Sequence, residues 1–89
     1  MLTWEIVASG RVQGVGFRRF VQSCAQRCQI TGWTKNLHDG NVQIEATGER
    51  RNLAFFLEHV RSGRGFIRVD ELSVKELDKT INYEYFNIR

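Results

Sequence analysis

The N-terminal residues alternate between apolar and polar side chains. One set comprises Leu2, Trp4, Ile6 and Ala8, and the other comprises Thr3, Glu5, Val7 and Ser9. Because a period of two places successive side chains on opposite faces of a strand, the pattern predicts a strand over Leu2–Ala8. One of its faces should be packed and the other more mixed.

Two later segments change to helical spacing. In the first, the apolar stripe consists of Phe17, Phe20, Val21, Cys24, Ala25 and Cys28. In the second it consists of Leu53, Phe56, Leu57 and Val60. Apolar residues three and four apart share one helix face. The spacing predicts a helix from Phe17 to about Cys28 and another that ends near Ser62-Gly63, each with one face on a sheet.

The remaining apolar positions predict further strands. Ile30–Asn36 and Val42–Ala46 flank an Asp39-Gly40 pair, which is favoured in tight hairpin turns. A fourth strand is indicated by Ile67, Val69, Leu72 and Val74, with a phase slip near Asp70-Glu71 that fits a bulge. Tyr83–Ile88 completes the pattern as a short terminal strand.

The resulting order is β-α-β-β-α-β plus a short terminal strand. It predicts an α+β, ferredoxin-like split β-α-β fold, with an antiparallel sheet and two helices on one face. The 89 residues form a single domain, 1–89. In this topology the first two strands run parallel with the third between them, so their carboxyl ends share one edge of the sheet. We therefore expect the Gly10–Arg18 loop to lie beside Asn36.

Composition narrows the functional classes only a little. The net charge is +3, but 13 basic residues are scattered among 10 acids, which does not single out nucleic acid. No apolar run approaches a membrane span, and the first residues lack a signal-peptide pattern, so we expect a cytoplasmic protein without a membrane partner. Nothing in the chain indicates more than a monomer. Cys24 and Cys28 lie four apart on the first helix, and we interpret them as small packing residues rather than a metal or disulfide site.

Three glycines occupy the junction between the first strand and the first helix. The stretch is Gly10-Arg11-Val12-Gln13-Gly14-Val15-Gly16-Phe17-Arg18. Unpaired N–H groups and the helix dipole make such a junction a potential anion site, and Arg18 adds a guanidinium fork that matches phosphate oxygens. Taken alone, the glycines fit a flexible turn with a surface arginine better than they fit an anion site.

The second stretch with chemical potential is Gly32-Trp33-Thr34-Lys35-Asn36, followed by Asp39-Gly40. A carboxamide can both accept a hydrogen bond from water and donate one to it. Asn36 alone would be an ordinary turn asparagine. Beside an anion site it becomes a candidate for positioning a water molecule.

These two stretches, at this spacing, resemble the two signature motifs of the acylphosphatase family, and the resemblance covers essentially the whole chain. It implies hydrolysis of the carboxyl-phosphate bond of small acyl phosphates without a metal or organic cofactor. The catalytic arginine then falls on Arg18 and the catalytic asparagine on Asn36. The phosphate-binding residues implied by the resemblance are Arg11, Val12, Gln13, Gly14, Val15, Gly16, Phe17 and Arg18.

This chain departs from the family pattern in one place. Family members often have a proline after the second helix, where this chain has Ser62-Gly63-Arg64-Gly65-Phe66. The sequence therefore does not predict the conformation of that loop, whereas the motifs of the site are unaffected.

The reaction requires no strong acid from the protein, because the leaving group of an acyl phosphate is already a carboxylate. What remains is to fix the phosphoryl group and stabilise its transition-state charge. His38 and Asp39 fall in the hairpin turn, and we interpret His38 as a solvated turn residue. The resemblance suggests that a phosphate oxygen of the substrate takes the proton of the attacking water.

Two other functions compete with hydrolysis. The first is a non-catalytic phosphate or carbamoyl-phosphate binding module on the same scaffold. The second is a single-stranded nucleic-acid binder, which would need exposed aromatic residues interleaved with Lys and Arg on central strands. The segment Val42–Ala46 has no aromatic residue, so nucleic acid is not an expected partner.

Overall fold

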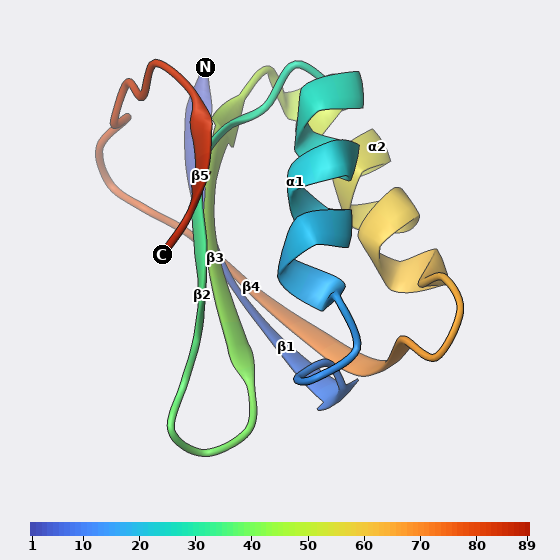
Figure 1. The fold of residues 1–89 in the computed structure, drawn as a ribbon. Helices are drawn as coiled ribbons and strands as arrows, with labels where there is room; N and C mark the ends of the chain where they lie inside the picture. The colour runs from blue at the N-terminus through green and yellow to red at the C-terminus, as the bar shows by residue number, and fades with distance from the viewer.

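The protein consists of two helices packed on one face of a five-stranded sheet (Figure 1). A computed structural model describes residues 1–89. The elements in chain order are β1 (Leu2–Arg11), α1 (Phe17–Arg27), β2 (Thr31–Asn36), β3 (Val42–Gly48), α2 (Arg50–Ser62), β4 (Arg68–Glu76) and β5 (Phe86–Ile88). The α+β fold with both helices on one face is the one that the sequence predicted. Neither helix is long and apolar enough to cross a membrane.

The strands are arranged in the order β4-β1-β3-β2-β5. β1 pairs antiparallel with both β3 and β4, and β2 pairs antiparallel with β3. β1 and β2 therefore run parallel with β3 between them, as predicted, and their carboxyl ends share the lower edge of the sheet in Figure 1. β5 joins the other side of β2 in parallel, so the complete sheet is mixed and not antiparallel throughout as the sequence predicted.

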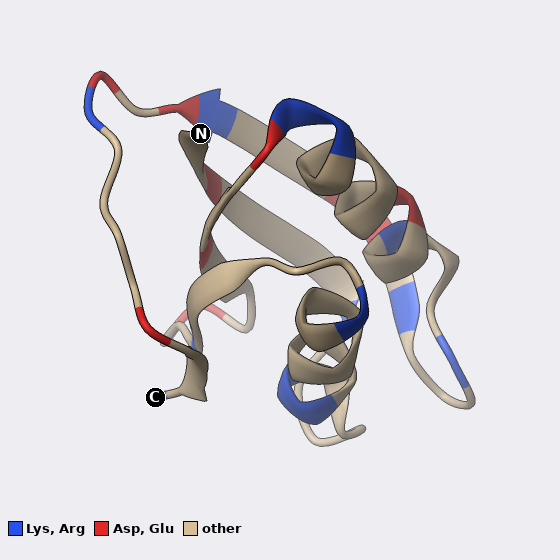
Figure 2. Cartoon of the chain, turned by 90° about the horizontal axis from the view of Figure 1, so that it is seen from above, with Lys and Arg blue, Asp and Glu red and all other residues tan.

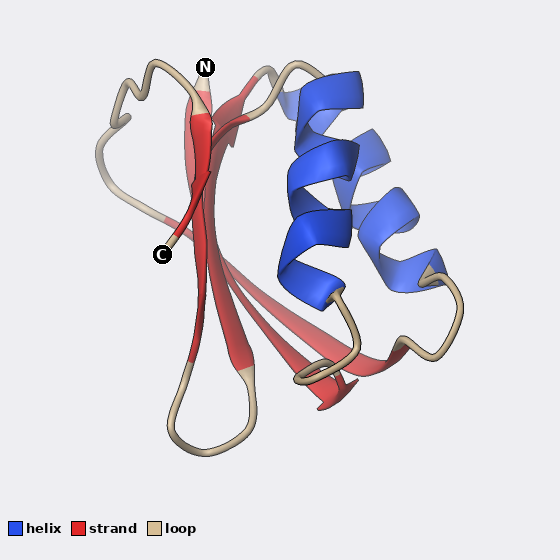
Figure 3. Ribbon diagram, viewed as in Figure 1, coloured by secondary structure: helices blue, strands red, loops and turns tan.

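The hydrophobic core fills the space between the sheet and the helices. Most of its members come from the predicted helices and strands, and the largest fully buried side chains include Ile6, Ile44, Phe17, Leu53 and Phe56. Removing this much apolar surface from water is the main stabilising contribution to the fold. The layered arrangement holds the start of α1 against the edge where β1 and β2 end (Figure 3).

The two cysteines occupy the core side of α1. Cys24 is buried, Cys28 is half-buried, and both are free thiols. Burial raises the pKa of each thiol, because the charged thiolate is disfavoured away from water. Cys24 is thus the packing residue that the sequence predicted, while Cys28 keeps one side at the surface.

The predicted phase slip in the fourth strand is a β-bulge. Ser9 pairs with Glu71 whereas Gly10 pairs with Val69, so Asp70 is left without a partner in β1. At Gly10, φ is +120° and an added Cβ would come within 2.3 Å of the Arg68 carbonyl oxygen. Only glycine fits this position, and the close approach lets β1 continue to Arg11 beyond its predicted end.

A segment that we name the strap, residues 77–85, crosses the face of the sheet opposite the helices (Figure 3). The strap is tied to the first strand because Leu77 N donates to the Thr3 carbonyl and Ile81 N donates to Thr3 Oγ1, each at 2.9 Å. Thr47 Oγ1 donates to the Ile81 carbonyl at 2.7 Å, and the Thr3 and Thr47 hydroxyls lie 2.7 Å apart. The two threonines are therefore buried on the face that the sequence predicted to be mixed.

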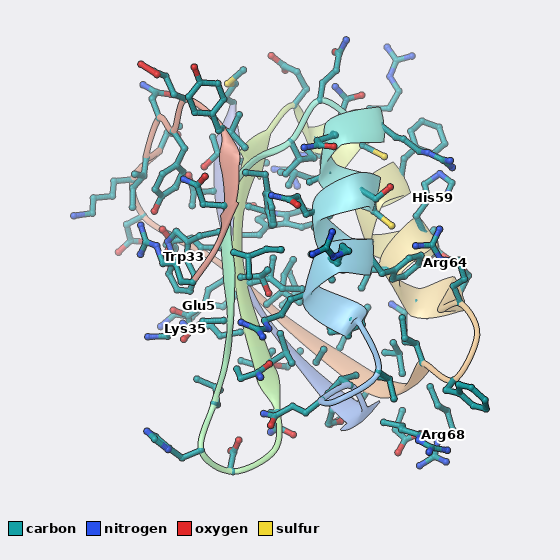
Figure 4. The ribbon with its side chains drawn as sticks, in the orientation of Figure 1. Glu5, Trp33, Lys35, His59, Arg64 and Arg68 are labelled. Atoms are coloured by element: carbon teal, nitrogen blue, oxygen red, sulfur yellow. The ribbon has the colours of Figure 1, made fainter.

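The strap also accounts for the short terminal strand. The prediction of a strand over Tyr83–Ile88 is wrong at its start, since only Phe86–Ile88 is extended and paired. Instead, the Tyr83 hydroxyl bonds to the Glu45 carboxylate and accepts a hydrogen bond from Trp33 Nε1 at 3.1 Å. Figure 4 shows Trp33, Glu5 and Lys35 on this face of the sheet, away from the helices.

Candidate functional site

A pocket of about 250 Å³ lies where the carboxyl ends of β1 and β2 meet the start of α1. It is lined by Val12, Gly14, Gly16, Phe17, Arg18, Arg19, Asn36 and Ile88. The glycine loop and Asn36, which are separated by a helix and a strand in the sequence, therefore come together as predicted from the topology. Arg19 and Ile88 also line the pocket and were not predicted.

The glycine loop holds a run of unpaired main-chain donors. From Gln13 to Arg19, no backbone N–H group donates a hydrogen bond to another atom of the protein. The first such bond of the helix runs from Phe20 N to the Gly16 carbonyl oxygen, at 3.0 Å. Unpaired amides at a helix start require a partner from outside the helix, and here the pocket provides room for one.

Gly16 is the N-cap residue of α1 and is left-handed, with φ at 78°. A Cβ at this position would meet no atom within 4 Å, so it is the backbone conformation, and not crowding, that calls for glycine. The left-handed residue turns the chain from the loop into the helix. As a result, the unpaired amides of the first turn follow directly after those of the loop.

The charged side chains in the first turn of α1 are both basic. The helix has no Asp or Glu, and its first turn contains Arg18 and Arg19 (Figure 2). The helix dipole repels a cation beside the helix N-terminus, and each such cation at an exposed position destabilises the helix by about 0.3–1 kcal/mol. A bound anion would offset this repulsion, and no acidic side chain lines the pocket to do so.

Arg18 is half-buried and anchored within the protein. Its Nη1 donates a hydrogen bond of 3.0 Å to the main-chain oxygen of Arg89. The Arg89 guanidinium lies over the Trp33 ring, 4.7 Å from its centroid. β5 thus contributes Ile88 to the pocket wall, and Arg89, which directly follows β5, contacts Arg18. The parallel pairing that brings β5 here left no recognisable signal in the sequence.

Asn36 is the last residue of β2 and is exposed. Its backbone is fixed by pairing with Val42 in β3. Its carboxamide makes no hydrogen bond within the protein, and Asn36 lines the same pocket as the glycine loop. The carboxamide is therefore free to bind a water molecule or a ligand.

Three residues of the predicted phosphate-binding stretch do not line the pocket. The Arg11 guanidinium lies over the ring of Phe66, a residue of the loop after α2. The distance from the guanidinium carbon to the ring centroid is 5.6 Å. Val15 packs against the core, and the Gln13 side chain donates to two carbonyl oxygens of the β2–β3 turn. Any contribution of Gln13 or Val15 to anion binding would therefore come from the main chain.

The titratable residues of the β2–β3 turn stand apart from the pocket. His38 is exposed, as predicted, and the Asp39 carboxylate accepts a hydrogen bond of 3.0 Å from Asn41 N within the turn. The other histidine, His59, lies on α2 (Figure 4). No group of three or more His, Cys, Asp or Glu residues is placed to hold a metal ion. The pocket thus presents amides, guanidinium groups and one carboxamide to a ligand.

Known proteins resemble this chain over nearly its whole length. The family model described as Acylphosphatase matches residues 4–88. A protein named Acylphosphatase from Bacillus licheniformis is 42% identical over 88 residues, which cover 99% of this chain and 98% of that protein. A crystal structure of acylphosphatase from Bacillus subtilis has a TM-score of 0.96 and 43% identity, and the match covers 100% of this chain and 99% of that one.

The same fold also occurs as a small part of a longer chain. The crystal structure of HypF from T. kodakarensis matches with a TM-score of 0.87 and 29% identity. That match covers 100% of this chain but 12% of HypF.

Proposed function

The chain belongs to the acylphosphatase family, hydrolases that act on the acid anhydride bond of acyl phosphates, and on this premise we propose how its residues divide the work. The main-chain amides of the glycine loop and Arg18 bind the phosphoryl group. Asn36 orients the attacking water. The substrate is a small acyl phosphate, and the products are a carboxylate and inorganic phosphate.

One observation carries this assignment more than any other. The N–H groups from Gln13 to Arg19 are unpaired, and the loop that holds them shares a pocket with Arg18 and Asn36. Amide and guanidinium donors suit the equatorial oxygens of a transferring phosphoryl group, whose charge is spread over three atoms. The carboxamide of Asn36, at the end of β2, suits a neutral water that needs one donor and one acceptor.

The bond changes balance without a side-chain acid or base. The water oxygen forms a bond to phosphorus while the bond from phosphorus to the carboxyl oxygen breaks, and the electron pair leaves with the carboxylate. A phosphate oxygen of the substrate accepts the proton that the water loses. Because carboxylate is a good leaving group, the protein has only to position the reactants and stabilise the transition state.

Two further properties are part of the proposal. The protein acts as a monomer, and it works in the cytoplasm, where its two free thiols would stay reduced. No metal or organic cofactor takes part in the proposed steps.

The test is a comparison of two substrates in the presence of a chelator. We expect rapid hydrolysis of benzoyl phosphate and little or none of p-nitrophenyl phosphate, because p-nitrophenolate is a poorer leaving group than benzoate and the proposed site supplies no acid to assist its departure. Equal rates on both would contradict the mechanism. Binding of inorganic phosphate without any turnover would instead identify a non-catalytic binding module.

A further inference from the structure

The side chain of Gln13 joins the glycine loop to the β2–β3 turn. Its Nε2 atom donates one hydrogen bond to the Leu37 carbonyl oxygen and another to the Asn41 carbonyl oxygen, each at 2.8 Å. Both N–H bonds of the amide are thereby used, and the side chain is partly buried. No other side-chain hydrogen bond links the glycine loop to this turn.

The two accepting carbonyls close the base of the turn. Leu37 N donates to the Asn41 carbonyl at 2.8 Å, and Gly40 N donates to the Leu37 carbonyl at 3.3 Å. Each carbonyl oxygen therefore accepts one bond from within the turn and one from Gln13. Leu37 directly follows Asn36, so the contact with Gln13 is one residue away from the proposed water-binding side chain.

From this geometry we infer that Gln13 is a positioning residue, which sets the distance between the amides of the glycine loop and the carboxamide of Asn36. The carboxamide has no hydrogen bond of its own within the protein, so its place depends on the backbone of residues 36–41. Gln13 connects that backbone to the loop that would hold the phosphoryl group. An in-line attack requires both parts to keep a fixed separation.

Glutamine suits this role better than the similar residues. Asparagine is one methylene shorter, and glutamate at neutral pH would direct a carboxylate at two carbonyl oxygens. Methionine has nearly the same length and no donor. These differences provide variants that remove the two hydrogen bonds while keeping the size of the side chain.

The inference rests on the proposed role of Asn36, and kinetics with benzoyl phosphate test both. For Gln13→Met we expect kcat to fall about tenfold to hundredfold, as small displacements at reacting groups do. The inhibition constant of inorganic phosphate should stay within about twofold, since the amides and Arg18 remain. Gln26→Met, the same change at an exposed position of α1, is the matched control and should leave both values unchanged.

Gln13→Glu provides a second variant and a pH signature. At neutral pH its kcat should be at least as low as that of Gln13→Met. As the pH falls and the carboxyl gains a proton, one donor returns, so the kcat of Gln13→Glu should rise relative to that of Gln13→Met. A constant ratio of the two rates across the pH range would contradict the inference.

A double-mutant cycle separates positioning from a general effect on the fold. If Gln13 acts through Asn36, Gln13→Met should lower kcat in the native background and cause no further loss in Asn36→Ala. The same loss in both backgrounds, or no loss in the native one, would overturn the inference while leaving the role of Asn36 intact. An Asn36→Ala enzyme with unchanged kcat would instead refute the proposed role of Asn36 in orienting the water.

Discussion

Arg18 Nη1 donates a hydrogen bond of 3.0 Å to the main-chain oxygen of Arg89, which joins the first turn of α1 to the end of β5. The bond restrains the guanidinium at the edge of the pocket. The Arg89 side chain is itself packed over Trp33. A group that is held in place beforehand loses little freedom when it engages the transition state, so more of its interaction energy lowers the barrier.

Replacing Arg18 should disable the enzyme without unfolding it. For Arg18→Gln we expect kcat/KM for benzoyl phosphate to fall by about 10³-fold, because a charged donor to the phosphoryl group is lost. Arg18→Lys should retain only a small part of the native kcat/KM, since an ammonium group cannot provide two parallel N–H bonds. Circular dichroism and steady-state kinetics measure the two effects.

Arg27→Gln is the matched control for the loss of a positive charge. Arg27 is exposed in the last turn of the same helix, at the end away from the pocket. Its kcat/KM should stay near that of the native enzyme. A similar loss of activity in both variants would mean that net charge, and not the contact made by Arg18, is what matters.

Gly16→Ala should reduce both stability and phosphate binding. A left-handed alanine costs about 1–2 kcal/mol, and the free energy of unfolding should fall by about that amount. We expect relief of this strain to displace the loop amides, which would raise the inhibition constant of inorganic phosphate. Urea unfolding and competitive inhibition give the two values.

Gly65→Ala separates the two effects of the glycine change. Gly65 is also left-handed, at φ +61°, and a Cβ there would again meet no atom within 4 Å. It lies in the loop after α2 and outside the pocket. This variant should lose similar stability but bind phosphate normally, and weaker phosphate binding in both would argue against a specific role for the loop amides.

Ionisation of the Tyr83 phenol should destabilise the folded protein at alkaline pH. Burial raises the pKa of its phenol, and the hydrogen bond to Glu45 adds to the shift. Above the ordinary tyrosine pKa of about 10, the unfolded chain gives up its proton before the folded protein does, so ionisation favours unfolding. The free energy of unfolding should therefore fall as the pH rises past this value.

Tyr83→Phe should remove that part of the pH dependence. At neutral pH the variant should be less stable by about 1 kcal/mol, because Glu45 and the Trp33 indole lose a hydrogen-bond partner. The difference in the free energy of unfolding between the native protein and the variant should shrink above about pH 10, as measured by urea unfolding at a series of pH values. A constant difference between native and variant across that range would contradict this account of the strap.

The sequence predicted the elements and the meeting of the glycine loop with Asn36, because these depend on local periodicity and on a topology with few alternatives. Even the bulge at Asp70 left a visible break in the apolar pattern. The strap left no such signal. Its contacts with Thr3 and Thr47 join residues far apart in the chain, and polar side chains give no periodic sign that they will be buried.

The contributions of β5 and Arg19 to the site could not be predicted for a related reason. A short apolar run indicates a strand but not its partner or direction, so the parallel pairing of β5 with β2 remained hidden. That pairing is what places Ile88 in the pocket and Arg89 beside Arg18. Arg19 lies outside the apolar stripe of α1, so periodicity gives no sign that at the first turn it lines the pocket.

The central claim is that the amides and Arg18 hold the phosphoryl group while Asn36 holds the water, and one measurement separates these tasks. It is kcat for benzoyl phosphate together with the inhibition constant of inorganic phosphate, in Asn36→Ala and, as a control, in His38→Ala. We expect Asn36→Ala to lower kcat by about 10²-fold or more while phosphate inhibits it as well as before, and His38→Ala to match the native enzyme. An Asn36→Ala variant with native kcat, or one that loses phosphate inhibition in step with kcat, would contradict the account.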